Sequence, residues 1–125
     1  MILDTNALSA FLQADGDLLA LLAGTPELHL PVIVLGEYRF GLGASRKRRV
    51  LLPMLERIEG QSVILVVDAT TARTYAEIRG ELRAAGSPIP QNDLWIAALA
   101  RQHALEIVSR DAHFDCVRGA RRRAW

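Results

Sequence analysis

The chain has 125 residues, of which 50% are apolar and 23% are charged, and its formal net charge is +1 at pH 7. This composition excludes a disordered chain, and the nearly neutral charge excludes a strongly basic nucleic-acid binder. The sequence has no apolar run of the ~20 residues that cross a bilayer, no basic start typical of a signal peptide, and only one cysteine, so we expect the protein in the cytoplasm. Its length is that of a single domain, which we expect to cover residues 1–125.

The first half of the chain predicts short strands that alternate with helices. Residues 1–4 predict a buried strand that ends on an acid, and Asn6 suits the N-cap of a helix over residues 7–14, which a second helix over 17–23 follows. Residues 28–30 predict a brief strand, and Pro31 suits the first position of the next helix because its missing N–H would be unpaired there. An amphipathic helix is expected over residues 46–59, and Pro53 should kink it or mark a new helix start.

The second half continues the alternation. Residues 62–67, SVILVV, form a continuous β-branched run, which is typical of a parallel strand covered on both faces. Asp68 predicts the N-cap of a long helix that Gly86 ends, and a last helix is predicted from Asp93 to about residue 103, with Asn92 available as its cap. A strand over residues 106–109 follows, so the chain is predicted to be an α/β fold with a mostly parallel central sheet of four to five short strands flanked by helices.

Three acidic residues occupy positions that such a sheet brings to one edge. Asp4 ends the first strand, Asp111 lies two residues beyond the last predicted strand, and Asp93 opens a helix. Ligand sites in parallel sheets lie beyond the carboxyl ends of the strands, and the start of a helix favours an anion. Each acid taken singly could also be a simple helix cap, but together they predict a convergent site.

A fourth acid, Glu37, lies inside an otherwise apolar helix segment, and its spacing alone favours the exposed stripe of that helix. If four carboxylates converge to about 5 Å, each pair repels by roughly 3 kcal/mol at an effective dielectric constant of about 20. The cluster must then bind protons or cations. Oxygen ligands without clustered cysteine or histidine favour Mg²⁺ or Mn²⁺ over Zn²⁺, and phosphodiester hydrolysis uses such sites.

In four segments the sequence resembles PIN-domain proteins, and among them the VapC-type toxin ribonucleases of type II toxin–antitoxin pairs: MILDTNALSAFL, VIVLGEYRFGL, IPQNDLWIAALA and IVSRDAHFD. The resemblance implies a PIN-like fold and a Mg²⁺- or Mn²⁺-dependent endoribonuclease that cleaves tRNA or ribosomal RNA. The implied mechanism is in-line attack by a metal-activated water, which leaves a 5′-phosphate and a 3′-hydroxyl. It further implies a homodimer and a small antitoxin protein, which would lay an apolar helix in a groove and place a basic side chain against the acids.

The same resemblance assigns four catalytic acids: Asp4, Glu37, Asp93 and Asp111. The three aspartates would hold the metal directly or through water, and Glu37 would support these ligands or a second metal. Asn6 and Ser109 match polar positions that orient the first acid and the metal-bound waters, and Asp115 is a possible fifth acid. No histidine is required as a base, so the three histidines are expected at the surface or in packing, and His113, beside the acids, is the one to test.

Other interpretations remain open at this point. A metal-dependent phosphoesterase that cleaves DNA would use similar acids, and a signalling receiver domain would also bind Mg²⁺ at strand ends. A receiver domain requires an acidic pair at the first strand and a late lysine, whereas here one aspartate ends that strand and the only lysine is Lys47. The basic runs at residues 46–49 and 121–123 could contact phosphates or could simply be solvated.

Overall fold

The computed structural model describes all of residues 1–125 and contains a five-stranded sheet with six α-helices. The strands are β1 (Ile2–Leu3), β2 (His29–Pro31), β3 (Val63–Leu65), β4 (Glu106–Val108) and β5 (Arg121–Arg123). The α-helices are α1 (Thr5–Leu12), α2 (Gly16–Leu22), α3 (Val32–Gly43), α4 (Arg48–Gln61), α5 (Ala69–Ala84) and α6 (Gln91–His103), and a 3-10 helix, η1, covers Ala112–Cys116. None of the helices combines the length and apolar content that crossing a membrane requires.

The strands are all parallel and lie in the order β3-β2-β1-β4-β5, which confirms the predicted α/β fold. In the register of β1, Ile2 lies opposite His29 on one side and opposite Ile107 on the other. From β1 the chain builds outward through β2 and β3 on one side, and through β4 and β5 on the other. The order therefore reverses between β1 and β4, which is where ligand sites form in open parallel sheets.

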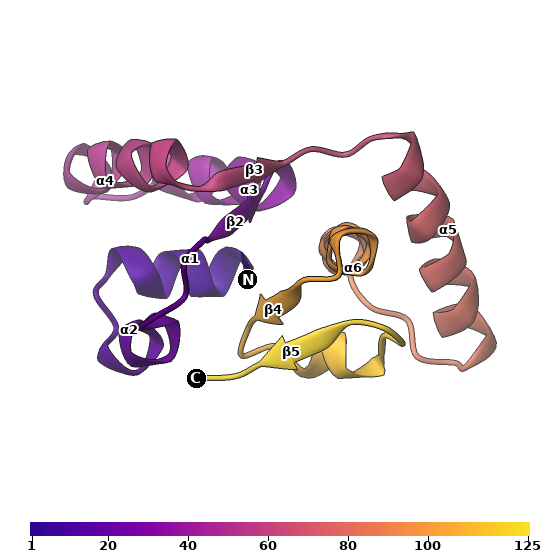
Figure 1. Cartoon of the computed structure of the whole chain (residues 1–125). Coiled ribbons are helices and arrows are strands. Elements are labelled where there is room, and N and C mark those ends of the chain that lie inside the picture. Colours follow the sequence, from indigo (N-terminus) through magenta and orange to yellow (C-terminus); the bar gives the residue numbers. More distant parts are fainter.

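One continuous apolar core joins the sheet to the helices. It contains 27 buried residues, among them both residues of β1, and Ile107 and Val108 of β4 are fully buried. Helix α6 contributes an unbroken buried run from Ile96 to Ala100 and contacts β4, while α5 packs on its outer side (Figure 1). The carboxyl ends of β1 and β4 are thereby held in rigid surroundings, because the residues before them cannot move without opening the core.

The strand predicted over residues 62–67 is shorter and more exposed than its sequence indicated. Only residues 63–65 pair, and β3 is an edge strand with a neighbour on one side alone. Val63, Val66 and Val67 are 36%, 58% and 40% exposed. The expectation of a strand covered on both faces was wrong, because a β-branched run does not by itself distinguish a central strand from an edge strand.

Several helix starts also differ from those predicted. Asp4, not Asn6, is the N-cap of α1, and α6 begins at Gln91 after Pro90, so the predicted start at Asp93 with Asn92 as cap was wrong. Pro31 ends β2 and precedes the first helical residue. The Asp68 cap of α5 is confirmed: Asp68 accepts hydrogen bonds from the backbone and side chain of Thr71.

Helix α4 is continuous through Pro53, so a new helix start at this residue, one of the two predicted outcomes, was wrong. The proline removes one hydrogen bond, which Arg49 four residues earlier would otherwise accept. Arg49 is exposed, so its carbonyl can be hydrated instead. Leu55 and Ile58 nevertheless face the core as their spacing predicted, while Leu51 is only partly buried.

Candidate functional site

Asp4 lies at the reversal point of the sheet, directly after β1, and is only 5% exposed. Its Oδ1 accepts a hydrogen bond of 2.7 Å from the backbone N–H of Ala7, and its Oδ2 accepts one from the hydroxyl of the fully buried Ser109. Burial raises the pKa of Asp4, these hydrogen bonds lower it, and the negative charges of Asp93 and Asp111 raise it again. The net effect is a raised pKa, so the ionised form of the Asp4 carboxyl group is destabilised when no cation is near.

Asp93 reaches the same place from the first turn of α6. Burial raises its pKa above the usual range; the hydrogen bond with His113 opposes that shift, and the charges of Asp111 and Glu37 add to it. The α6 N-terminus has no side-chain cap, so its free N–H groups and dipole favour a negative charge there. The N-terminus of α6 therefore offsets part of the repulsion between Asp93 and the other acids.

Asp111 enters the site from the loop after β4. Its backbone N–H donates a 2.9 Å hydrogen bond to Ser109 Oγ, so Ser109 links Asp4 and Asp111 through a single hydroxyl. Asp111 also caps η1 by accepting a 2.9 Å bond from the backbone N–H of His113. These hydrogen bonds fix the direction in which the Asp111 side chain points from the loop.

Glu37 is exposed on α3, as its spacing predicted, and it nevertheless lines the same cavity as the three aspartates. The hydroxyl of Thr5, the first residue of α1, donates a 3.0 Å hydrogen bond to Glu37 Oε1. The exposed stripe of α3 thus borders the site, so exposure and a role in the site are compatible.

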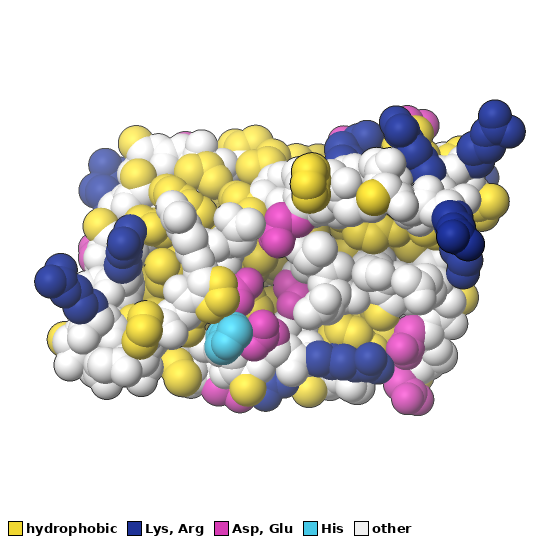
Figure 2. Space-filling view, turned by 180° about the vertical axis from the view of Figure 1, so that it is seen from behind, with side chains coloured by type: hydrophobic (Ala, Val, Ile, Leu, Met, Phe, Trp, Pro, Cys, Tyr) yellow, Lys and Arg dark blue, Asp and Glu magenta, His cyan; other side chains and the backbone are white.

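The four acids line one open and mainly polar cavity of about 560 Å³. Figure 2 shows acidic side chains gathered around a histidine in the middle of one face, with lysine and arginine side chains toward its edges. The cavity has one apolar lining residue among ten, which are Asp4, Thr5, Asn6, Glu37, Pro90, Gln91, Asn92, Asp93, Ile96 and Asp111. Such a lining suits hydrated ions and polar groups better than an apolar ligand.

The remaining predicted site residues separate into two groups. Ser109 and Asn6 lie at the site, Ser109 through its bond to Asp4 and Asn6 as an exposed part of the cavity lining. Asp115 does not line the cavity. Its two oxygens accept hydrogen bonds of 2.8 and 2.6 Å from Arg122, which lower the pKa of Asp115 below its usual range.

His113 is the histidine that the sequence placed beside the acids, but its contacts with two of their carboxylates were not predicted. Its Nδ1 lies 2.9 Å from Asp111 Oδ1 and 3.2 Å from Asp93 Oδ2, so one ring nitrogen faces two carboxylates. The only signal in the sequence was its position two residues after Asp111. Thr5 and Gln91 were also missed, because nothing in their local sequence distinguishes them from ordinary helix residues.

The ligand atoms present fit a divalent cation. One atom each from Asp93, Asp111 and His113 lies within 4.8 Å of the others, and Asp4, which is not part of this group, lines the same cavity. Carboxylate oxygens suit Mg²⁺ and Mn²⁺, while a single imidazole beside them is also accepted by first-row transition metals. The arrangement can hold a cation and orient water and phosphate oxygens around it.

Residues 1–120 match the PIN domain family, which includes the whole of the sheet apart from β5. The chain belongs to the PIN domain family. This assignment agrees with the predicted resemblance and with the site at the reversal point of the sheet.

Individual relatives of this PIN domain cover most of its length. It is 32% identical to a VapC ribonuclease from Sinorhizobium fredii over 89% of this chain and 86% of that protein. The crystal structure of VapBC2 from Rickettsia felis bound to a promoter DNA fragment superposes with a TM-score of 0.87, at 26% identity over 99% of this chain and 97% of that one. VapBC-5 from Mycobacterium tuberculosis, described as a member of the VapBC family of toxin–antitoxin systems, gives a TM-score of 0.76 at 31% identity, over 98% and 94%.

Proposed function

We propose that this PIN domain is a metal-dependent endoribonuclease and the toxin of a toxin–antitoxin pair. The observation that carries the proposal is the convergence of Asp4, Glu37, Asp93 and Asp111 on one polar cavity. Support comes from the relative named a VapC ribonuclease, which covers 89% of the chain, and from the likeness to VapBC structures. The acids, the fold and these relatives all point to hydrolysis of a phosphodiester bond in RNA.

Asp4, Asp93 and Asp111 are the residues that would hold Mg²⁺, or Mn²⁺ in its place. When bound, the cation supplies Lewis-acid activation of a water and neutralises charge on the phosphate. Ser109 and the N–H of Ala7 hold Asp4 in one orientation, and His113 bridges the carboxylates of Asp93 and Asp111. The chain thus contributes fixed oxygen ligands, which need little reorganisation during the reaction.

Glu37 and Asn6 form the outer part of this proposed site. Thr5 holds the Glu37 carboxylate at the rim of the cavity, where it can accept a hydrogen bond from a water or support a second cation. The exposed amide of Asn6 can donate a hydrogen bond to a phosphate oxygen and accept one from a water. Both residues would orient groups around the metal without carrying its charge.

RNA is the proposed substrate, with tRNA or ribosomal RNA as the expected class, and in-line attack would leave a 5′-phosphate and a 3′-hydroxyl. The open cavity supports access by an extended strand. Basic residues 46–49, just before and at the start of α4, are exposed and form no ion pair, so they remain available to phosphates. The run at 121–123 is less available, because its arginines pair with Glu106 and Asp115.

The proposed regulatory partner is a small antitoxin protein, and the proposed assembly includes a homodimer in the cytoplasm. Exposed apolar side chains support protein contacts: Phe40 on α3 is 88% exposed, and Val50 on α4 is 65% exposed. A groove of about 360 Å³ between α1 and α4, lined in part by Phe11 and Met54, offers an apolar helix a place to pack.

The test is cleavage of single-stranded RNA by the purified chain. We expect cleavage with Mg²⁺, loss of cleavage in EDTA and recovery with Mn²⁺. Asp93→Asn and Asp111→Asn should each lower the rate at least 100-fold, because each removes a metal ligand. The matched control is Glu56→Gln on α4, an exposed acid without an ion pair, which should cleave at the wild-type rate.

Persistent cleavage in EDTA, or full activity of both aspartate variants, would refute the proposed site. The same assay with single-stranded DNA of equal sequence separates the proposed ribonuclease from a DNA phosphoesterase. Faster cleavage of the DNA than of the RNA would favour that alternative.

A further inference from the structure

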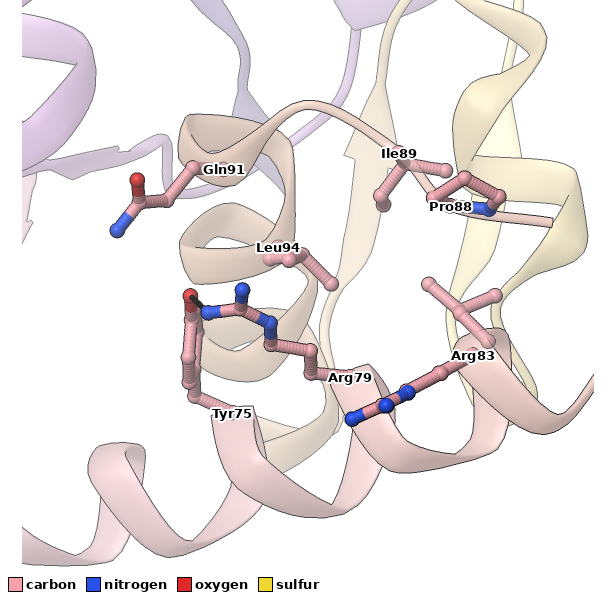
Figure 3. Close-up of a pocket in the computed structure, with 8 residues that line it drawn as sticks. Tyr75, Arg79, Arg83, Pro88, Ile89, Gln91 and Leu94 are labelled. Atoms are coloured by element: carbon pink, nitrogen blue, oxygen red, sulfur yellow. Dashed lines mark hydrogen bonds between the residues drawn. The ribbon is translucent and has the colours of Figure 1, made fainter. Parts of the chain in front are cut away.

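A second cavity, of about 420 Å³, lies between α5 and the start of α6 (Figure 3). Its apolar surface comes from Leu82, Leu94 and Ile89, and its polar wall comes from successive turns of α5, where Tyr75, Arg79 and Arg83 lie. The volume falls within the range of about 300–1,000 Å³ that is usual for small-ligand pockets. It is therefore large enough for a planar group the size of a nucleobase.

This second cavity adjoins the acidic one. Gln91 lines both of them, and the consecutive residues Asp93 and Leu94 point into the acidic cavity and the second cavity respectively. The first turn of α6 thus lies between the two cavities. A strand whose phosphate lies at the acids would pass over Gln91 and place a neighbouring nucleotide in the second cavity.

The arginines of the second cavity have no acidic partner. Six other arginines in the chain form ion pairs with carboxylates: Arg39, Arg101, Arg110, Arg121, Arg122 and Arg123. Arg79 and Arg83 form none, and both are exposed one helical turn apart. Their charges are available to an anion, and a phosphate at this position would be held beside the site that cleaves its neighbour.

The aromatic side chain of Tyr75, which lines the second cavity, holds Arg79 in one orientation. Trp95 stacks on Tyr75 with ring centroids 3.9 Å apart, and Arg79 Nη1 donates a 3.0 Å hydrogen bond to the Tyr75 hydroxyl. The Arg79 guanidinium also lies 6.0 Å from the Tyr75 ring centroid. Figure 3 shows Arg79 reaching along the wall to Tyr75, with Arg83 on the next turn. Guanidinium planes and aromatic rings of this kind are surfaces on which single-stranded RNA bases stack.

We propose that the second cavity is a nucleotide subsite, which holds the base and phosphate of the RNA residue next to the one cleaved. The base would contact the apolar surface around Leu94 and Ile89, and Arg79 and Arg83 would bind the phosphate. This inference rests on the proposed ribonuclease function and names a substrate contact outside its acids. A protein helix is the other possible occupant, but two unpaired arginines and continuity with the acidic cavity favour a phosphate-bearing ligand.

The test compares the double variant Arg79→Ala/Arg83→Ala with Arg73→Ala, an exposed arginine of α5 outside the cavity. We expect the double variant to raise KM for a 12-residue single-stranded RNA about tenfold at nearly unchanged kcat. It should leave cleavage of a minimal dinucleotide unchanged, because that substrate has no phosphate beyond the scissile one for the two arginines to bind. Arg73→Ala should match the wild type on both substrates.

A measurement of RNA binding distinguishes failure of the proposed subsite from failure of the proposed ribonuclease function. Fluorescence anisotropy with the same labelled 12-mer is measured in an Asp93→Asn background, with and without the two alanine substitutions. Loss of the phosphate contact that the two arginines share should reduce the slope of log affinity against log salt by roughly 0.7. Arg79→Lys/Arg83→Lys should restore the slope, because it keeps both charges.

Each outcome of these experiments supports or overturns either the subsite or the proposed ribonuclease function. Unchanged KM and unchanged salt slope in the double variant would overturn the subsite while leaving the nuclease intact. Absence of RNA cleavage by the wild type would refute the proposed function instead, and the anisotropy arm would still test the subsite. A change in oligomeric mass of the double variant in light scattering, with RNA binding unaltered, would identify the cavity as a protein interface and overturn the proposal.

Discussion

Ser109 and Asp4 are 105 residues apart in the sequence, and in the interior of the protein the hydroxyl of Ser109 donates a hydrogen bond to Asp4 Oδ2. The same hydroxyl oxygen accepts the backbone N–H of Asp111. One buried serine therefore joins the acid that follows β1 to the acid that follows β4. The two halves of the site are aligned by this link as well as by the pairing of the strands.

Replacement of this serine should separate the two acids. Ser109→Ala leaves a buried carboxylate oxygen and a backbone N–H without a partner, at a cost of about 1–3 kcal/mol in the free energy of unfolding. We expect RNA cleavage to fall about 10- to 100-fold, as for other residues that orient metal ligands. Chemical denaturation and cleavage rates measure the two effects. Ser62→Ala, whose hydroxyl forms no hydrogen bond, is the control, and an unaltered rate in Ser109→Ala would contradict the proposed link.

The ionisation of Asp93 should make the metal-free protein less stable as the pH rises. Burial raises the pKa of Asp93 in the folded chain, so its stabilising contribution is complete below the usual value of 3.8 and is lost as the pH rises through the folded value. Asp93→Asn cannot ionise. In EDTA its Tm should exceed that of the wild type by about 2–5 °C near pH 7, with the difference shrinking toward about pH 4.

Thermal unfolding across this pH range measures the effect, with the exposed Asp17→Asn as control. Added Mg²⁺ should raise the Tm of the wild type more than that of Asp93→Asn, because the variant lacks a ligand. A lower Tm for Asp93→Asn in EDTA at neutral pH would show that the acids do not repel one another in the folded chain.

Asp115 should prove dispensable for catalysis, although it lies only four residues beyond Asp111. Both of its oxygens bind Arg122, which in turn donates to the Ser109 carbonyl at 3.2 Å. Asp115→Asn should cost about 1 kcal/mol of stability, since the Asp115 side chain is 52% exposed, and should leave the rate within about twofold of wild type. Parallel assays with Asp111→Asn provide the contrast; equal loss in both variants would return Asp115 to the site.

His113 should affect the metal more than the fold. Its Nδ1 faces Asp93 and Asp111, so His113→Ala should weaken Mn²⁺ binding about tenfold, as measured by titration calorimetry, and raise the Mn²⁺ concentration needed for cleavage. His103→Ala changes an exposed histidine at the end of α6 and should have no effect. Wild-type Mn²⁺ affinity in His113→Ala would assign the ring a packing role.

The sequence predicted the features that depend on neighbouring residues. Alternation of apolar runs with amphipathic segments predicted the α/β fold and its parallel sheet, and the chemistry of Asp68 predicted the start of α5, because capping is a contact over three residues. The positions of Asp4, Asp93 and Asp111 beyond strands and at a helix start predicted that they would lie at one edge. Glu37 and the functional class came from resemblance to PIN-domain proteins.

Only the tertiary structure decided the features that depend on distant partners. Asp111 and Asp115 are alike in sequence, yet one lines the cavity and the other is neutralised by Arg122 from β5. The β-branched run at residues 62–67 belongs to an edge strand because no further strand pairs with β3. The contacts of His113 and the bridge from Ser109 to Asp4 likewise arise only when β4 pairs beside β1. Local sequence encodes which groups can bind a cation, whereas the order of the strands determines which of them meet.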